Sequence, residues 1–125
     1  MPILKKQSKK RNGKYNVAPK AQRTYKGKVY DSKLEKEYRG KLELLKRATK
    51  ESNRVVHIEE QVPFEFVING TKVCTYLLDF RVLYADGRIE HIDVKGILTD
   101  VYRIKKKLML ACYGIQIKEI KKGQF

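Results

Sequence analysis

The chain has few cysteines, no long apolar run and no acidic side chain in its first 30 residues. Cys74 and Cys112 lie far apart and in no metal-ligand spacing, which favours two reduced, packed thiols over a disulfide framework or a zinc site. No stretch approaches the ~20 apolar residues that cross a bilayer, and Met1-Pro-Ile-Leu4 is too short for the apolar part of a signal peptide. We therefore expect a cytoplasmic protein.

Positive charge is what the chain has in excess. The net charge is +15, and residues 1–30 hold ten Lys and Arg with no acid, so they carry +10 of it. The other 95 residues hold 19 basic and 14 acidic side chains, a difference of +5. Such a basic block binds phosphates through counterion release, so nucleic acid is the expected partner. A membrane surface is disfavoured, because the block lacks an apolar stripe and a glycine at position 2.

The sequence divides into a basic arm over residues 1–24 and one domain over residues 25–125. Lys, Arg, Asn, Gly and Pro dominate the arm and no apolar period appears, which predicts a disordered segment. A chain of 125 residues has room for one domain with one core.

The first half of the domain changes from a helical period to a strand period. Asp31 or Ser32 can cap a helix over 32–49, whose apolar positions include Tyr38 and Leu42. Strands follow over 62–68 and 71–84, on either side of the hairpin signal Asn69-Gly70. A type I′ turn there would place Glu60, Val62 and Phe66 opposite residues 79, 77 and 73 respectively.

The second half repeats the change of period in the opposite order. A strand over 88–95 precedes a helix that Thr99 or Asp100 can cap and that Gly114 can end. Its expected apolar positions are Val101, Ile104, Leu108 and Cys112. Alternation over 115–120 predicts a last strand. The order helix, three strands, helix, strand predicts an α/β fold in which helices flank a mixed sheet.

Asp79 and Asp93 each interrupt an apolar run, and the loop between their strands decides whether they meet. A two-residue turn at Asp86-Gly87 would put them on opposite faces of the sheet. A three-residue loop over 85–87, with Gly87 in the left-handed conformation, would pair Asp79 with Asp93 and leave Lys95 on the same face. Two close carboxylates need a counter-charge, and Mg²⁺ or Mn²⁺ suits hard oxygen ligands. The alternative is an Asp79–Lys95 salt bridge with Asp93 solvated.

The order of elements, with Glu35 on the first helix, Asp79 on the second strand and Asp93-Val94-Lys95 on the third, resembles the PD-(D/E)XK nuclease superfamily. Residues 14–120 are similar to a small phage-encoded family of that superfamily. The longer segments that carry this similarity are 29–35, 76–80, 93–96 and 102–108. Leu78 stands where the superfamily's name-giving motif has proline.

The resemblance implies a restriction-endonuclease-like fold and Mg²⁺-dependent hydrolysis of DNA phosphodiesters. It makes Asp79, Asp93 and the Val94 carbonyl metal ligands, with Glu35 contributing directly or through water, and Lys95 a catalytic residue. Relatives include Holliday junction resolvases, so branched DNA, DNA recombination or replication, a homodimer and the cytoplasm of a phage host are expected.

For further residues a purely structural role is the alternative to a functional one. Glu35 also completes a capping box with Ser32, and Glu37 and Glu43 are alternatives on the same helix. His91 shares a face with Asp93 and could touch DNA or simply pack. The expected DNA-binding residues are Lys9, Lys10, Arg11, Lys14, Arg103, Lys105, Lys106 and Lys107. A non-catalytic basic DNA-binding protein is the alternative function, and an RNA binder would explain the charge without the inward acids.

Overall fold

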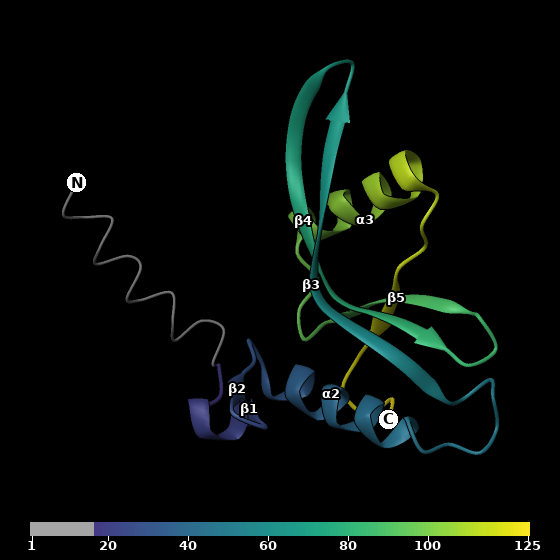
Figure 1. Cartoon of the computed structure of the whole chain (residues 1–125). Helices are drawn as coiled ribbons and strands as arrows, with labels where there is room; N and C mark the ends of the chain where they lie inside the picture. The colour runs from purple at the N-terminus through teal and green to yellow at the C-terminus, as the bar shows by residue number, and fades with distance from the viewer. Residues whose placement is uncertain (1–16) are drawn as a thin grey trace.

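The computed structural model describes residues 17–125. A 3-10 helix, η1 (Lys20–Arg23), and a small hairpin, β1 (Thr24–Tyr25) and β2 (Lys28–Val29), precede helix α2 (Lys33–Leu45). Strands β3 (Val55–Ile68), β4 (Thr71–Tyr84) and β5 (Ile89–Val94) follow, then helix α3 (Asp100–Tyr113) and strand β6 (Lys118–Ile120) (Figure 1). The main elements have the predicted α/β order, and η1 forms inside the segment predicted as an arm.

The main sheet is mixed, with the strand order β3-β4-β5-β6. The first three strands are antiparallel, and β6 runs parallel to β5 after the α3 crossover. The β5–β6 pair lies between the two helices. Ile92, Val94 and Ile120 belong to the core that includes Tyr38 and Leu42 of α2. On the other face Lys95 and Glu119 contact Tyr102 of α3.

The β3–β4 hairpin is long and bent, and its two ends belong to different cores (Figure 1). Phe80 and Val82 pack with α2 in one core, whereas Tyr76 and Leu78 pack with Tyr102 and Met109 of α3 in the other. The change from one core to the other therefore falls at Asp79.

A bulge makes the predicted register of this hairpin wrong. Asn69 and Gly70 have the positive φ values, 52° and 79°, that a type I′ turn requires. The register then shifts between Phe66 and Val67, which leaves Val73 as the extra residue of β4. Phe66 faces Cys74, Val62 faces Leu78, and Glu60 faces Phe80, each one residue from its predicted partner. Leu78 is therefore buried and Leu77 exposed.

Both helices have the predicted caps, but of the four predicted apolar positions of α3 only Leu108 packs against the core. Thr99 Oγ1 accepts a hydrogen bond from Tyr102 N (3.1 Å), and Gly114 ends the helix at φ 68°. Val101 and Ile104 are 61% and 59% exposed. Tyr102 and Met109 are buried instead, because the Tyr102 ring packs near Tyr76 while its hydroxyl reaches Glu119.

Two smaller expectations also change. Helix α2 ends at Leu45, before the predicted residue 49. Cys74 is partly buried but Cys112 is exposed, and both are free thiols. Over residues 17–125 no helix is long and apolar enough to span a membrane.

Candidate active site

The loop between β4 and β5 has three residues, which confirms the predicted pairing of the two acids. Tyr84 N donates to Arg88 O (2.9 Å), and Gly87 has a φ of 90°. The register runs from Leu83 opposite Ile89 to Phe80 opposite Ile92. One further step along both strands sets Asp79 against Asp93, so the two-residue alternative is excluded.

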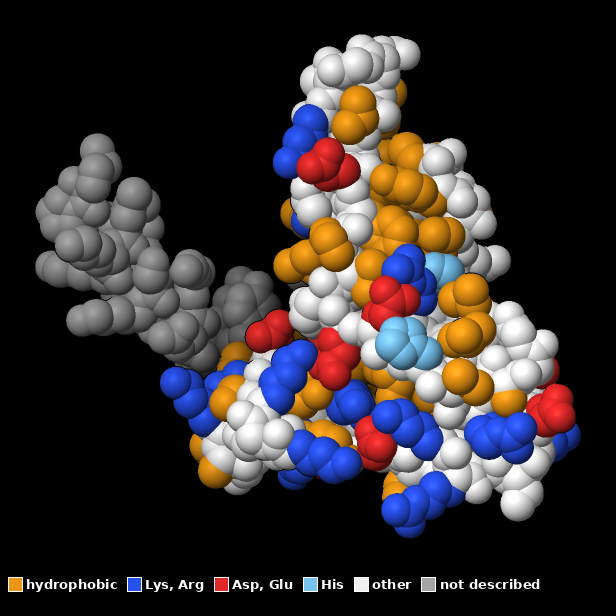
Figure 2. Space-filling model, viewed as in Figure 1, with side chains coloured by type: hydrophobic (Ala, Val, Ile, Leu, Met, Phe, Trp, Pro, Cys, Tyr) orange, Lys and Arg blue, Asp and Glu red, His pale blue; other side chains and the backbone are white. Residues whose placement is uncertain are grey.

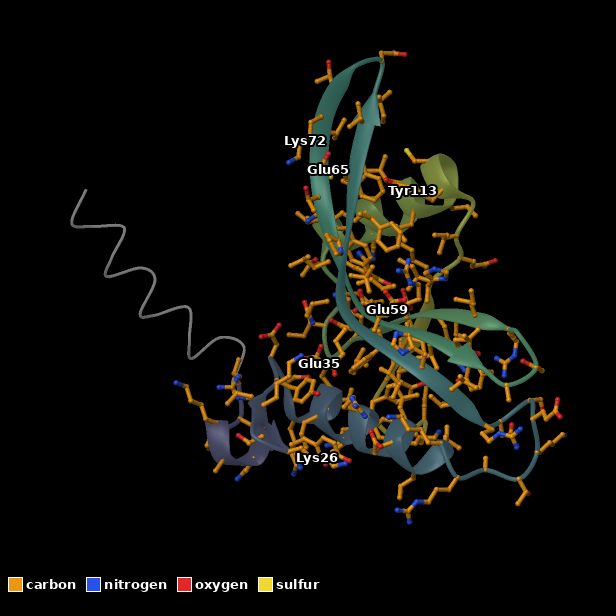
Figure 3. The ribbon with its side chains drawn as sticks, in the orientation of Figure 1. Lys26, Glu35, Glu59, Glu65, Lys72 and Tyr113 are labelled. Carbon is orange, nitrogen blue, oxygen red and sulfur yellow. The ribbon has the colours of Figure 1, made fainter. Side chains whose placement is uncertain are left out.

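Three acidic side chains meet where the hairpin bends. Glu35 comes from α2, Asp79 from β4 and Asp93 from β5, and Glu35 and Asp93 are 3% and 2% exposed. Gln61 Nε2 donates to Glu35 Oε2 (3.3 Å) and to Asp79 Oδ1 (3.4 Å), and so bridges the first two acids. Asp79 Oδ2 accepts from Val94 N (2.9 Å), which ties β4 to the end of β5. Figure 3 shows Glu35 at the start of α2, beside the hairpin.

Glu35 both anchors the start of α2 and joins the acid cluster. Ser32 Oγ accepts from Glu35 N (3.0 Å), so Ser32 is the N-cap of α2. The Glu35 Oε1 atom accepts from Asp31 N (3.0 Å), one residue before the amide of an ordinary capping box. Its Oε2 atom is directed to Gln61, so the same carboxyl group anchors the helix start and joins the acid cluster.

The acids lie so close that each affects the ionisation of its neighbour. Burial raises the pKa of Asp79 to about 7, and repulsion from Glu35 adds to this shift. Burial also raises the pKa of Asp93 to about 7, with repulsion from Asp79 as the next cause. Burial raises the pKa of Glu35. A cation placed among these groups would favour their ionised forms.

Lys95 is the positive charge at this cluster. Its Nζ lies 3.3 Å from Asp93 Oδ1 and 4.1 Å from the centre of the Tyr102 ring. The predicted alternative, Lys95 on Asp79 with Asp93 solvated, is wrong, because Asp93 is the more buried acid and is the partner of Lys95. Tyr102 is held through its hydroxyl, which donates to Glu119 Oε2 (2.8 Å).

Tyr76 and Gln61 belong to the cluster although the sequence pattern did not indicate them. The Tyr76 hydroxyl donates a hydrogen bond to Asp93 Oδ2. Gln61 faces Asp79 only because the bulge at Val73 shifts the register by one residue. The pattern of apolar residues does not indicate the one-residue shift of register at Val73. The length of the loop over 85–87, in contrast, predicts the pairing of Asp79 with Asp93.

Several other predicted residues lie away from the acids. Glu60 binds Lys28 (2.6 Å) and Arg39 (3.1 Å), so it does not support Asp79 as expected. Glu43 pairs with Arg39 (2.9 Å), which leaves Glu35 as the acid that α2 contributes. His91 packs near Phe64, and burial lowers its pKa. Charged side chains of both signs and histidines gather on the face shown in Figure 2.

The predicted DNA-binding residues fall into three groups. Arg103 pairs with Asp100 (3.2 Å) and Lys106 with Glu119 (2.9 Å). Lys105 lines a cavity together with Lys95, and Lys107 lines a separate groove along α3. The remaining four, Lys9, Lys10, Arg11 and Lys14, lie outside the described residues.

The donor set fits a hard divalent cation that keeps much of its water. Within residues 17–125, no three His, Cys, Asp or Glu side chains form a ready-made metal cage. Mg²⁺ needs only one or two carboxylates in addition to water and substrate oxygens. Asp79 and Asp93 supply those two carboxylates, and the Val94 carbonyl is the third donor that the resemblance implies.

Comparison with protein families adds one finding. A family model described as "Protein of unknown function (DUF1064)" matches residues 12–122. The chain belongs to the DUF1064 family. The DUF1064 match spans every helix and strand from η1 to β6, so Glu35, Asp79, Asp93 and Lys95 all lie inside it. No curated protein matches the chain. No solved structure matches it either.

Proposed function

We propose that the protein is a metal-dependent DNA endonuclease with a restriction-endonuclease-like fold. The observation that carries the proposal is the cluster of Glu35, Asp79 and Asp93, with Glu35 and Asp93 buried and Lys95 Nζ 3.3 Å from Asp93. Acids from a helix and two paired strands, beside one lysine, form a set that can hold a cation and hydrolyse a phosphodiester. Because burial raises the pKa of Asp79 and Asp93 to about 7, a cation that binds at neutral pH would displace protons from them.

Each residue of the group has a chemical role in this proposal. Asp79, Asp93 and the Val94 carbonyl would hold Mg²⁺ or Mn²⁺, with Glu35 binding it directly or through water. The cation supplies Lewis-acid polarisation of the phosphate and charge neutralisation. Lys95 Nζ is placed to orient the attacking water and to balance the negative charge that develops on the phosphate.

The charge of the chain supports DNA as the substrate. The net charge of +15 favours binding to a polyanion, and ten of the basic residues fall in the first 30 positions. Within this proposal the finer expectations are a phage-encoded enzyme of recombination or replication, branched DNA of the Holliday-junction type as substrate, and a homodimer in the host cytoplasm.

Cleavage assays test the enzyme directly. Wild-type protein with Mg²⁺ or Mn²⁺ should cut at least one DNA in a panel of junction, flap, nicked, duplex and single-stranded substrates. Asp93→Asn should lower the rate by about 100-fold or more, because it removes a cation ligand. Asp100→Asn, an exposed acid at the start of α3, is the matched control and should cut normally. Absence of cutting with both metals, or full activity of Asp93→Asn, contradicts the proposal.

A non-catalytic basic DNA-binding protein is the second candidate, favoured by the excess positive charge in residues 1–30. Titration calorimetry with Mg²⁺ or Mn²⁺ separates the two candidates. Binding heat that is lost in Asp79→Asn supports a metal site, whereas DNA binding with no metal heat supports the second candidate.

A further inference from the structure

A second, positively charged site adjoins the acid cluster. A cavity of about 330 Å³ lies between β4 and the first turns of α3. Its polar lining comes from Thr75, Lys95, Thr99 and Lys105, and no acidic side chain lines it among the described residues. We propose that this cavity binds the phosphate next to the cleaved phosphodiester of the same DNA strand, an inference that rests on the proposed function.

The cavity and the acid cluster share a wall. Tyr76 and Lys95 line the cavity, and both also contact Asp93: the Tyr76 hydroxyl through Oδ2 and Lys95 Nζ at 3.3 Å from Oδ1. A strand with one phosphate at the acids and their cation can therefore place the next phosphate beside the lysines. The two sites have opposite charge, as a cation and an anionic strand require.

Lys105 is the residue that distinguishes this cavity from an ordinary basic helix surface. Of its basic neighbours on α3, Arg103 pairs with Asp100 and Lys106 with Glu119, whereas Lys107 lines the separate groove. Within residues 17–125, Lys105 has no carboxylate partner. Lys105 therefore has its charge available to a ligand, and the threonine hydroxyls can donate to the same phosphate.

The rim of the cavity indicates a nucleotide rather than a free phosphate ion. Leu77 and Val101 line it and are 55% and 61% exposed, so they can contact sugar or base atoms. The lysine ammonium and threonine hydroxyl groups of the lining can bind a phosphate without reading a base. The site should therefore raise affinity equally for all DNA sequences.

The test compares Lys105→Ala with Lys50→Ala in the full-length protein. Lys50 is exposed in the turn after α2, so Lys50→Ala removes the same charge at a place away from the cavity. DNA binding is measured by fluorescence anisotropy in EDTA, where no metal-dependent cutting occurs, over a range of salt. We expect Lys105→Ala to weaken binding by about fivefold or more and to lower the salt slope by about 1, with a smaller change for Lys50→Ala.

Single methylphosphonate substitutions in the DNA then locate the contact. One neutral linkage next to the cut position should weaken DNA binding by the wild type. The same linkage should not weaken DNA binding by Lys105→Ala any further, because this variant already lacks the lysine that contacts the phosphate. If wild type cuts DNA and Lys105→Ala equals Lys50→Ala in affinity and slope, the cavity proposal is refuted and the nuclease stands.

Other outcomes would support the phosphate site and refute the nuclease, or refute both proposals. If no DNA is cut, the nuclease proposal is refuted. A loss of DNA affinity that is specific to Lys105→Ala and coupled to one methylphosphonate position would still support a phosphate site in the cavity. Absence of DNA binding by the wild type refutes both proposals.

Discussion

Asp79 and Asp93 are the residues at which folding and function oppose each other. Both are held close together and away from water, and both therefore have a pKa of about 7. A divalent cation bound between them would favour their ionised forms and release protons. In the proposed function, cation binding would therefore be coupled to the loss of these protons.

The contribution of Asp79 and Asp93 to the stability of the metal-free protein should fall as pH rises from about 4 to about 7. Asp79 and Asp93 have pKa values raised from 3.8, so the folded state holds more protons than the unfolded state in that window, and the stabilising contribution is lost above it. Asp79→Asn removes one ionisation and should be more stable than wild type at pH 8 by about 1–2 kcal/mol, but not at pH 4.

Urea unfolding in EDTA at both pH values measures this effect, with Asp100→Asn as the control. Added Mg²⁺ at pH 8 should restore stability to wild type and not to Asp79→Asn. A wild-type protein that gains stability between pH 4 and 8 through these acids would contradict the assignment.

Tyr76 should tune Asp93. Its hydroxyl donates to Asp93 Oδ2 and lowers the pKa of that carboxyl group against the effect of burial. Tyr76→Phe should therefore shift the acid limb of the cleavage pH profile to higher pH, and cost about 1–2 kcal/mol of stability at pH 8. Tyr113→Phe, which removes a hydroxyl bonded to the Glu65 carbonyl near the far end of the hairpin (Figure 3), should leave the profile unchanged. Equal profiles for the two variants would show that Tyr76 only packs.

At the scale of elements, the loop over residues 85–87 determines whether the two acids meet. Gly87 has a φ of 90°, a conformation that L side chains rarely adopt. Gly87→Ala should destabilise the protein by about 1 kcal/mol or more. Gly40→Ala is the control of opposite sign: in α2 its added methyl would meet Tyr25 at an ordinary 3.6 Å, so it should stabilise the helix by up to about 1 kcal/mol. Thermal unfolding of both variants measures the difference, and destabilisation by both would contradict it.

The sequence predicted the elements better than their contacts. The bounds 71–84 of β4 were correct because turn residues mark both ends. The facing of β3 and β4 was wrong because the bulge at Val73 leaves the alternation of residue types almost unchanged. The face of α3 was wrong because two apolar stripes exist on it, and only the packing of Tyr102 against Lys95 and Tyr76 selects the buried one.

For the whole molecule, the bent hairpin sets the position of the acids, and the distribution of charge sets where positive side chains lie along the sequence. The acids lie where the α2 core changes to the α3 core. The distances between Glu35, Asp79 and Asp93 therefore depend on the packing of both cores. Most of the net positive charge lies in the first 30 residues, ahead of the acid-bearing elements. Those charges can raise the local concentration of DNA without contributing to the chemistry.

The salt dependence of DNA binding should separate the role of the arm from that of the site. A Lys9→Gln/Lys10→Gln double variant removes two charges from residues 1–24, and should lower the slope of log affinity against log salt by about 2, because each phosphate contact contributes ~0.9. Lys50→Gln/Lys122→Gln, an exposed pair in the domain, is the control of equal charge and should lower it less. Anisotropy titrations give the slopes, and single-turnover cleavage at saturating protein should be the same for all three proteins. Equal slopes for the two variants would mean that net charge, and not the arm, attracts DNA.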